Sequence, residues 1–466
     1  MAKEKTKPNW LDPNTTAENE KLPKYVKWAW SSRAVSLAIN LVFIMQLTYY
    51  CTDILLMPAT LVGTLLLASK LFDGMTDLAV GFIIDHTRTK WGKARPYEIF
   101  ILLAWLFTIL LYSTPEFGIV GKSIYVFLMY SLIQSICTTF LNGADAVYLA
   151  RSVRSSKNQV SMMSFNGALV MVGSVVMSAL LPQLIQGIGT TKAGWTAMAC
   201  VMGIPLGLIG MLRFVFVKEV VTDTEQKEDS KKSDDKASNK ISMKEGLKCL
   251  AKNKYIFILA GMNFLVNLTT NMGTAANNYY FKWIMGDIGL ASVLSLASLI
   301  TPVMLIGFPV LSRKFGATTL LRVGAVISAA GFIVRIVGGT NMVTLVLGSL
   351  LITVGQVPIS MMISIYLIDC MEYGARKTGV RVEGLITSVN SFTGKVGSGI
   401  ASGLLGIVMG RAGYNAALAV QSASATTAIH MVFNIIPFIL MVLFVVLAVI
   451  YRIDKDLKKM RAEEVK

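Results

Sequence analysis

Residues 70–96, KLFDGMTDLAVGFIIDHTRTKWGKARP, carry two aspartates one helical turn apart, Asp73 and Asp77, inside an apolar segment that ends in a basic loop. A carboxylate near the centre of a bilayer costs about 2.5–3.5 kcal/mol on insertion scales. In a helix these side chains lie about 40° apart around the axis and about 6 Å apart along it, so one ion can contact both. Like charges this close favour a shared proton or a bound monovalent cation. The pair therefore predicts a transport protein with a cation site.

Composition places the rest of the chain in a membrane. Of 466 residues, 54% are hydrophobic and 15% are charged, and the mean hydropathy is +0.60. Soluble domains carry about 25% charged residues. Twelve apolar stretches have roughly bilayer length and none shows strand-period alternation, which predicts an all-α membrane protein with twelve transmembrane helices. The stretches are residues 34–56, 60–84, 97–112, 122–149, 161–186, 193–217, 255–281, 290–311, 319–337, 342–368, 384–409 and 430–451.

Basic residues are concentrated in the loops after the second, fourth, eighth and tenth stretches. The positive-inside rule then predicts a multi-pass protein of the plasma or inner membrane with both termini in the cytoplasm. The formal net charge of +17 follows from this topology and from contact with anionic lipid. We therefore expect no nucleic-acid partner, and a monomer in the bilayer.

A charged low-complexity run, residues 222–240, separates six apolar stretches from six and predicts a flexible linker. After it, the capping box at Ser242 and Glu245 predicts a short helix on the inner membrane surface. A short likeness between the loops after the second and eighth stretches indicates two related halves. The expected domains are an N-terminal tail (1–33), a six-helix bundle (34–217), a cytoplasmic central loop (218–254), a second six-helix bundle (255–451) and a C-terminal tail (452–466).

Several motifs resemble those of a known family. The pattern G-x-x-x-D…G-K-x-R at residues 81–95 resembles the loop signature of the major facilitator superfamily. FDGMTD at 72–77, YYCTD at 49–53 and DCMEYGARKTGVRVEG at 369–384 resemble the glycoside-pentoside-hexuronide:cation symporters. The resemblance implies the major facilitator fold of two six-helix bundles. It also implies symport of a sugar or glycoside by alternating access, with no cofactor and with Na+ or H+, or Li+ as a further candidate, as the coupling ion.

The resemblance also assigns roles to residues. The cation-binding candidates are Asp73, Asp77, Thr76 and Thr139. Their charge partners are Lys395, by resemblance, and Lys70, which lies three residues before Asp73. A buried salt bridge that only neutralises the aspartates is the alternative. The expected cytoplasmic gate consists of Asp85, Arg88, Lys93, Arg95, Asp369, Arg381 and Glu383.

Polar residues recur at helical spacing on several apolar stretches, which indicates faces that do not contact lipid. These faces give the candidates for solute binding, Asn40, Thr138, Asn142, Asp145, Asn267, Asn271, Asn278, Gln356 and Ser391. Small polar residues also join helices to one another, at about 0.6 kcal/mol per hydrogen bond, and this alternative is equally open. For Asp145, an ion pair with Arg151 or Arg154 is a second alternative.

Other functions fit less well. The chain has no Ser/His/Asp set, no HExxH and no phosphate-binding loop, and its five cysteines lack metal-ligand spacing, so we expect neither an enzyme nor a structural metal. A channel or receptor does not need two matched halves. Where the resembling family binds sugar, this chain has Leu37, Asn142 or Gly143, and Met163 or Ser164. The solute therefore stays open, with a non-sugar amphiphilic or organic solute as the alternative to a sugar.

Overall fold

The computed structural model describes residues 9–12, 15–87, 89–220, 250–378 and 383–464. Across these ranges the regular structure is helical, apart from one isolated bridge between Thr89 and Gly92. Eleven helical spans in these ranges are long and apolar enough to cross a membrane. A further 28-residue helix, α3 (Ala59–His86), carries one lysine and three aspartates, which lower its hydropathy. The prediction of an all-α membrane protein is therefore confirmed.

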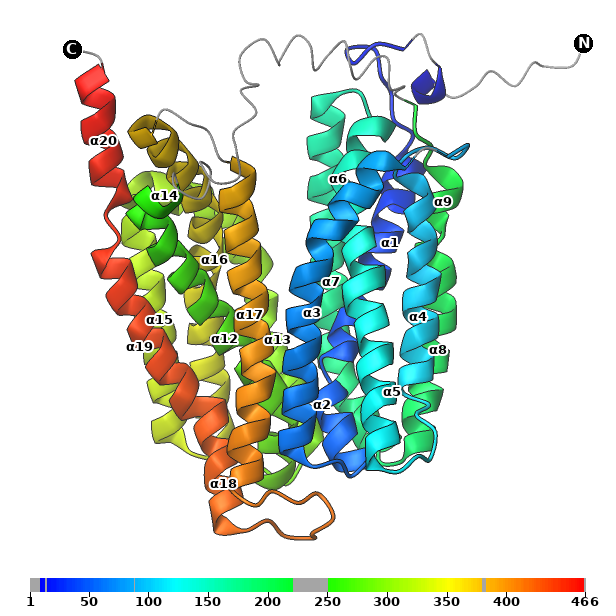
Figure 1. Cartoon of the computed structure of the whole chain (residues 1–466). Helices are drawn as coiled ribbons and strands as arrows, with labels where there is room; N and C mark the ends of the chain where they lie inside the picture. The colour runs from blue at the N-terminus through cyan, green and yellow to red at the C-terminus, as the bar shows by residue number, and fades with distance from the viewer. Residues whose placement is uncertain (1–8, 13–14, 88, 221–249, 379–382, 465–466) are drawn as a thin grey trace, which may run out of the picture. The chain divides into compact units, whose positions relative to one another are not determined.

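The first six apolar stretches correspond to helices (Figure 1). Several of these helices are interrupted by 3-10 or π-helical turns. They are α1 (Lys24–Ile44) with α2 (Leu47–Tyr49) and a π-helical turn (Tyr50–Ile54); α3; a 3-10 turn (Arg95–Ile99) with α4 (Phe100–Leu111); α5 (Ile119–Ser131), a π-helical turn (Leu132–Thr138) and α6 (Thr139–Ser152); α7 (Ser156–Gly187); and α8 (Lys192–Gly210) with α9 (Leu212–Phe216).

The last six stretches form longer helices and one additional helix at the C-terminus. They are α12 (Lys254–Trp283); α13 (Ala291–Leu296), flanked by 3-10 turns (Ile288–Leu290 and Ala297–Leu299), with α14 (Ile300–Phe315); α15 (Ala317–Gly338); α16 (Met342–Thr378); α17 (Glu383–Arg411); α18 (Ala423–His430), a π-helical turn (Met431–Ile435) and α19 (Ile436–Ile450); and α20 (Ile453–Glu464).

Two boundaries differ from the sequence-based expectations. The first helix begins at Lys24 rather than at residue 34, because the carboxylates of Glu98 and Asp145 neutralise Arg33 and the helix can include it. Residues 453–464, expected as a tail, form the polar helix α20. The short surface helix expected after Ser242 and the linker at 222–240 lie outside the described residues.

The chain divides into two compact units. The first comprises the described residues of 1–44, 72–178 and 187–220, and its core includes Trp30, Ile84 and Tyr148. The second comprises the described residues of 45–71, 179–186 and 250–464, and its core includes Tyr255 and Phe444. Residues 45–71, which the sequence grouped with the first bundle, pack in the second unit. The division into two six-helix bundles stays a prediction.

Glycines let α3 approach α17 closely inside the second unit. A Cβ added to Gly63 would lie 3.0 Å from backbone atoms of Gly403 and Gly406. A Cβ added to Gly406 would lie 2.3 Å from the carbonyl oxygen of Ala59. Small residues at such a crossing are typical of helix packing in membranes, where dispersion contacts replace the hydrophobic effect. The first half of α3 is thereby fixed on α17.

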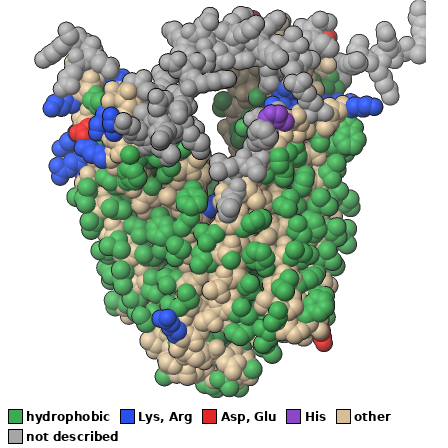
Figure 2. Space-filling view, viewed as in Figure 1, with side chains coloured by type: hydrophobic (Ala, Val, Ile, Leu, Met, Phe, Trp, Pro, Cys, Tyr) green, Lys and Arg blue, Asp and Glu red, His purple; other side chains and the backbone are tan. Residues whose placement is uncertain are grey.

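Large apolar side chains remain exposed along the helices, as Figure 2 shows for one face. Val120 and Val201 are each 73% exposed and Val337 is 81% exposed. In a helix whose backbone groups are internally bonded, such a surface suits contact with lipid. The protein is therefore a membrane protein with its apolar helix faces turned outward.

Candidate functional site

Asp73 lies in the middle of α3 with only 4% of its surface exposed. Thr139, the first residue of α6, donates from Oγ1 to Asp73 Oδ1 at 3.2 Å. Thr76 donates to the backbone oxygen of Asp73 at 3.0 Å. Asp77 follows one turn later in the same helix, and its side chain lies outside the described part. The structure thus brings the side chains of two of the four cation-binding candidates, Asp73 and Thr139, into direct contact. Their carboxylate and hydroxyl oxygens are the ligand types that hard cations prefer.

A π-helical turn precedes Thr139 and separates α5 from α6. The Thr139 hydroxyl also lies 3.1 Å from the carbonyl oxygen of Gln134, inside this turn. Single π-turns in α-helices are rare and occur often at functional sites. This turn could not be predicted from the sequence, because the segment carries neither proline nor glycine.

The two lysines expected as charge partners lie in the second unit and are half-buried. The Cβ of Lys70 lies 2.8 Å from the position that a Cβ on Gly399 would take. Lys395 is one turn before Gly399 on α17. Lys70 therefore packs on the segment of α17 that carries Lys395. An ion pair of either lysine with Asp73 or Asp77 stays a prediction.

Asp145 belongs to a buried group of four charged side chains in the first unit. Its Oδ1 binds Arg213 Nη2 at 2.6 Å and also contacts Arg33 Nη2. Glu98 lies 3.5 Å from Arg33 Nε and 3.6 Å from Arg213 Nε. Asp145 is 27% exposed, whereas the other three side chains are at most 2% exposed. The Arg213 guanidinium also lies 3.4 Å above the ring of Trp30. Two arginines and two carboxylates leave this group without net charge.

Asp145 is therefore not paired with the arginines that are close in sequence. Arg151 binds Glu219 at 2.7 Å, and Arg154 donates to the carbonyl oxygens of Trp10 and Val220. The actual partners come from α1 and α9, 112 and 68 residues away in the chain. Arg33, Glu98 and Arg213 were missed as functional candidates, although each is a charge inside or beside a predicted span.

Glu219 organises the basic loop that follows α3. Its carboxylate accepts the backbone N–H groups of Lys93, Ala94 and Arg95 at 3.0, 2.7 and 2.8 Å, and the side chain of Arg151 at 2.7 Å. Hydrogen bonds to an ionised acceptor are roughly twice as strong as neutral ones. The loop is thus fixed to the segment after α9 within the first unit.

The glycine and arginine of the loop signature serve this same contact. Gly92 has φ +119°, and a Cβ there would lie 2.4 Å from the Glu219 carboxyl carbon, so only glycine fits. Arg95 donates to the carbonyl oxygen of Phe214 at 2.7 and 2.9 Å. A gating contact made by Lys93 and Arg95 stays a prediction.

The other expected gate residues are only partly described. Arg88 and Arg381 lie outside the described residues, as do the side chains of Asp85 and Glu383. Asp369 is half-buried on α16 and lines a cavity next to α20.

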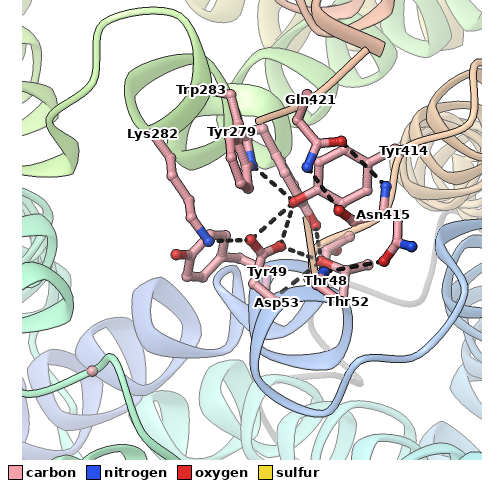
Figure 3. Close-up of polar contacts among 12 residues, drawn as sticks. Thr48, Tyr49, Thr52, Asp53, Tyr279, Lys282, Trp283, Tyr414, Asn415 and Gln421 are labelled. Carbon is pink, nitrogen blue, oxygen red and sulfur yellow. Dashed lines mark hydrogen bonds and ion pairs between the residues drawn. The ribbon is translucent and has the colours of Figure 1, made fainter. Parts of the chain in front are cut away.

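Asp53 is the centre of a polar cluster at the C-terminal end of α12 (Figure 3). Its fully buried carboxylate accepts Lys282 Nζ at 2.6 Å, Tyr414 OH at 2.8 and 2.9 Å, and Thr52 Oγ1 at 2.8 Å. The hydroxyls of Thr52 and Tyr279 are 2.6 Å apart. The cluster connects the π-helical turn after α2 to α12 and to the segment after α17. In the sequence, only the motif YYCTD at residues 49–53 pointed to this cluster.

Asn278 belongs to the same contact region. Its amide donates to Gln46 Oε1 at 2.6 Å, and only 2% of the residue is exposed. Asn40 is fully buried and donates to Thr108 at 2.8 Å. Asn40 joins two helices and Asn278 joins α12 to the turn before α2. A role of either residue in solute binding stays a prediction.

The remaining solute-binding candidates either are more exposed than Asn40 and Asn278 or lie along a polar face of a helix. Asn267 and Asn271 each donate to a backbone oxygen one turn earlier on α12, at 2.8 Å. Asn142 and Ser391 are exposed, Gln356 is half-buried and Thr138 is 8% exposed. Their role in solute binding stays a prediction.

Comparisons with known proteins agree with this architecture. Residues 33–455 match the family model described as MFS/sugar transport protein. The chain is 29% identical over 437 residues to an isoprimeverose transporter of Lactiplantibacillus pentosus, covering 91% of this chain and 88% of that protein. It is 24% identical over 438 residues to a glucuronide carrier protein homolog of Escherichia coli K12, covering 90% of each.

Solved structures show the same fold at low sequence identity. A D-xylose-proton symporter superposes with a TM-score of 0.63 at 13% identity, covering 91% of this chain and 96% of that one. The nucleoside transporter NupG gives a TM-score of 0.63 at 13% identity, covering 91% and 98%. The predicted major facilitator fold is therefore confirmed. The chain belongs to the MFS/sugar transport protein family, the glycoside-pentoside-hexuronide symporters that its motifs resemble, and is a secondary transporter rather than an enzyme.

Proposed function

We propose that this protein couples the transport of a sugar or glycoside to a monovalent cation, with Asp73 as the central cation ligand. The observation that carries the proposal is a carboxylate at 4% exposure inside an apolar helix, with the Thr139 hydroxyl 3.2 Å away. An ionisable group in this position is costly unless it has a functional partner. Na+ or H+ at Asp73, with Asp77 as a second ligand, supplies that partner.

The coupling follows from charge. A cation at Asp73 lowers the repulsion between the two helical carboxylates, and Lys395 competes for the same negative charge when the ion has left. The protein would then alternate between two conformations around a solute bound near the middle of the membrane. The cluster around Asp53 joins the segment after α2 to α12 within the second unit. We propose that this contact opens during transport and that the Asp53–Lys282 pair then breaks.

The solute is proposed from the relatives and from local charge. One relative is named as an isoprimeverose transporter and another as a glucuronide carrier homolog. In the first unit the arginines nearest Asp145 are already neutralised by Asp145 and Glu98. This balance favours a neutral glycoside over an anionic one, and isoprimeverose is the first solute to test. We also propose a monomer in the cell membrane with both termini in the cytoplasm.

Reconstitution in liposomes tests the proposal. We expect uptake of the solute when a Na+ or H+ gradient is imposed and none when the gradient is dissipated. A thermal-shift screen against sugars in Na+, Li+ and K+ at two pH values identifies the ion and solute first.

The variant Asp73→Asn is expected to keep its fold and solute binding but lose gradient-driven uptake. Glu116→Gln, at a carboxylate that is 89% exposed, is the matched control and should transport normally. Gradient-driven uptake by Asp73→Asn at the rate of the unsubstituted protein would refute the proposed ion site. Uptake that no ion gradient stimulates in either protein would indicate a facilitator.

A further inference from the structure

A polar cavity of about 450 Å³ lies in the second unit, where the C-terminal helix α20 meets α15 and α16. Its lining contains five basic side chains and two carboxylates, Asp369 and Asp454. The basic residues are Arg322, Arg452, Lys455, Lys458 and Arg461. The cavity therefore presents an excess of positive charge.

The walls of this cavity are held by specific contacts, so α20 is not a loose tail. Asp456 accepts Tyr255 OH at 2.7 Å and lies 3.1 Å from Lys254 Nζ on α12. Arg461 Nε binds Glu372 on α16 at 2.9 Å. These bonds fix both ends of α20.

Only part of this positive charge is bound by groups of the protein itself. Arg322 donates to the carbonyl oxygens at the end of α19, and Arg461 is paired with Glu372. Arg452, Lys455 and Lys458 are exposed, and none forms an ion pair with a described residue. Three cations thus converge on one concave site.

The cavity also lies where a membrane surface is expected. On the last turns of α19, Val446 is 49% and Ile450 55% exposed. On α15, Val323 is 46% and Val326 55% exposed. These apolar side chains suit lipid tails, and Figure 2 shows Lys and Arg side chains gathered just beyond the hydrophobic surface, over α20. Basic pockets at this level of a membrane protein suit lipid head groups.

We propose that this cavity binds a phosphate group, as presented by the head group of an anionic membrane lipid or by a free phosphate ion. Lys455, Lys458 and Arg452 supply the charge that attracts the phosphate. The site is separate from the cation site at Asp73 and does not depend on which solute is transported.

Binding is tested on the purified full-length protein in neutral detergent by thermal shift. The ligands are dihexanoyl phosphatidylglycerol, dihexanoyl phosphatidylcholine and inorganic phosphate. We expect phosphatidylglycerol to raise the melting temperature more than phosphatidylcholine, whose choline cancels the phosphate charge. A larger response to phosphatidylglycerol than to inorganic phosphate assigns the site to lipid, and the reverse order assigns it to the free ion.

The variant Arg452→Gln/Lys455→Gln/Lys458→Gln should weaken the apparent affinity at least tenfold. Lys458→Gln alone, at an exposed position, keeps the test valid if the triple variant folds poorly, and should weaken binding by a smaller factor. Lys459→Gln removes a charge from the same helix outside the cavity lining and should bind normally. Equal responses in the control and in the cavity variants, or equal responses to the two lipids, would overturn the proposal.

Discussion

Replacing Lys282 by methionine removes the charge from the Asp53 cluster while keeping the length and apolar stem of the side chain. In the structure Lys282 Nζ lies 2.6 Å from Asp53 Oδ1, and the aspartate side chain is completely buried. After the substitution, Asp53 keeps its hydrogen bonds from Tyr414 and Thr52 but loses its cation. The contact between this turn and α12 should weaken.

The size of the effect follows from burial. Removing one partner of a fully buried ion pair costs about 3–5 kcal/mol. Lys282 is 29% exposed and two hydroxyls still donate to Asp53, so we expect a smaller loss of about 2 kcal/mol. That free energy changes the equilibrium between the closed and the open contact about 30-fold in favour of the open state.

Cys51 provides the assay, because it is completely buried two residues before Asp53. Its alkylation by a water-soluble maleimide, followed on its own peptide by mass spectrometry, should be about 30-fold faster in Lys282→Met. Cys137, which is also completely buried but lies in the first unit, should stay protected and excludes global unfolding. Lys192→Met, at a half-buried lysine 3.9 Å from Glu116, is the control and should leave the rate unchanged. An unchanged rate in Lys282→Met would refute the role of the ion pair in holding this contact together.

Two further predictions concern stability. Glu219→Gln should lower the free energy of unfolding by about 2 kcal/mol, because three backbone N–H groups and Arg151 lose an ionised acceptor. Denaturation of this variant and of the control Glu116→Gln measures the difference, and equal midpoints would contradict the prediction. Gly406→Ala should destabilise the packing of α3 on α17 by about 1–3 kcal/mol, because its Cβ meets a carbonyl oxygen at 2.3 Å. Gly167→Ala, which has no neighbour within 4 Å, should have no such effect on the melting temperature.

Hydropathy was sufficient for the all-α membrane class, because in a bilayer the apolar length of a helix and its internal hydrogen bonds leave few other solutions. The major facilitator fold was implied by the resemblance of the loop motifs. The helix boundaries were harder to predict where a charge lies near the membrane edge. Arg33 illustrates this, since the helix could be extended to Lys24 only with knowledge of Glu98 and Asp145.

The candidate site was only partly predictable. Asp73 could be found because an acidic residue in an apolar stretch is a strong local signal. The contacts of Asp53 with Lys282 and Tyr414 span 229 and 361 residues, so no local pattern reveals them. The role of Glu219 depends on the backbone conformation of Gly92, which becomes visible only in the folded loop.

Asp145 shows how a charge inside a membrane helix can be assigned to structure or to transport. Both arginines that bind it are almost fully buried, and Glu98 completes a neutral group, so the four side chains support one another in the first unit. Removing the Asp145 carboxylate leaves two buried arginines to share Glu98, which should cost about 3 kcal/mol of stability. Asp145→Asn should therefore lower the melting temperature, while the protein that remains folded transports with an unchanged KM. A raised KM at unchanged stability would instead show that the 27% exposed carboxylate binds the solute.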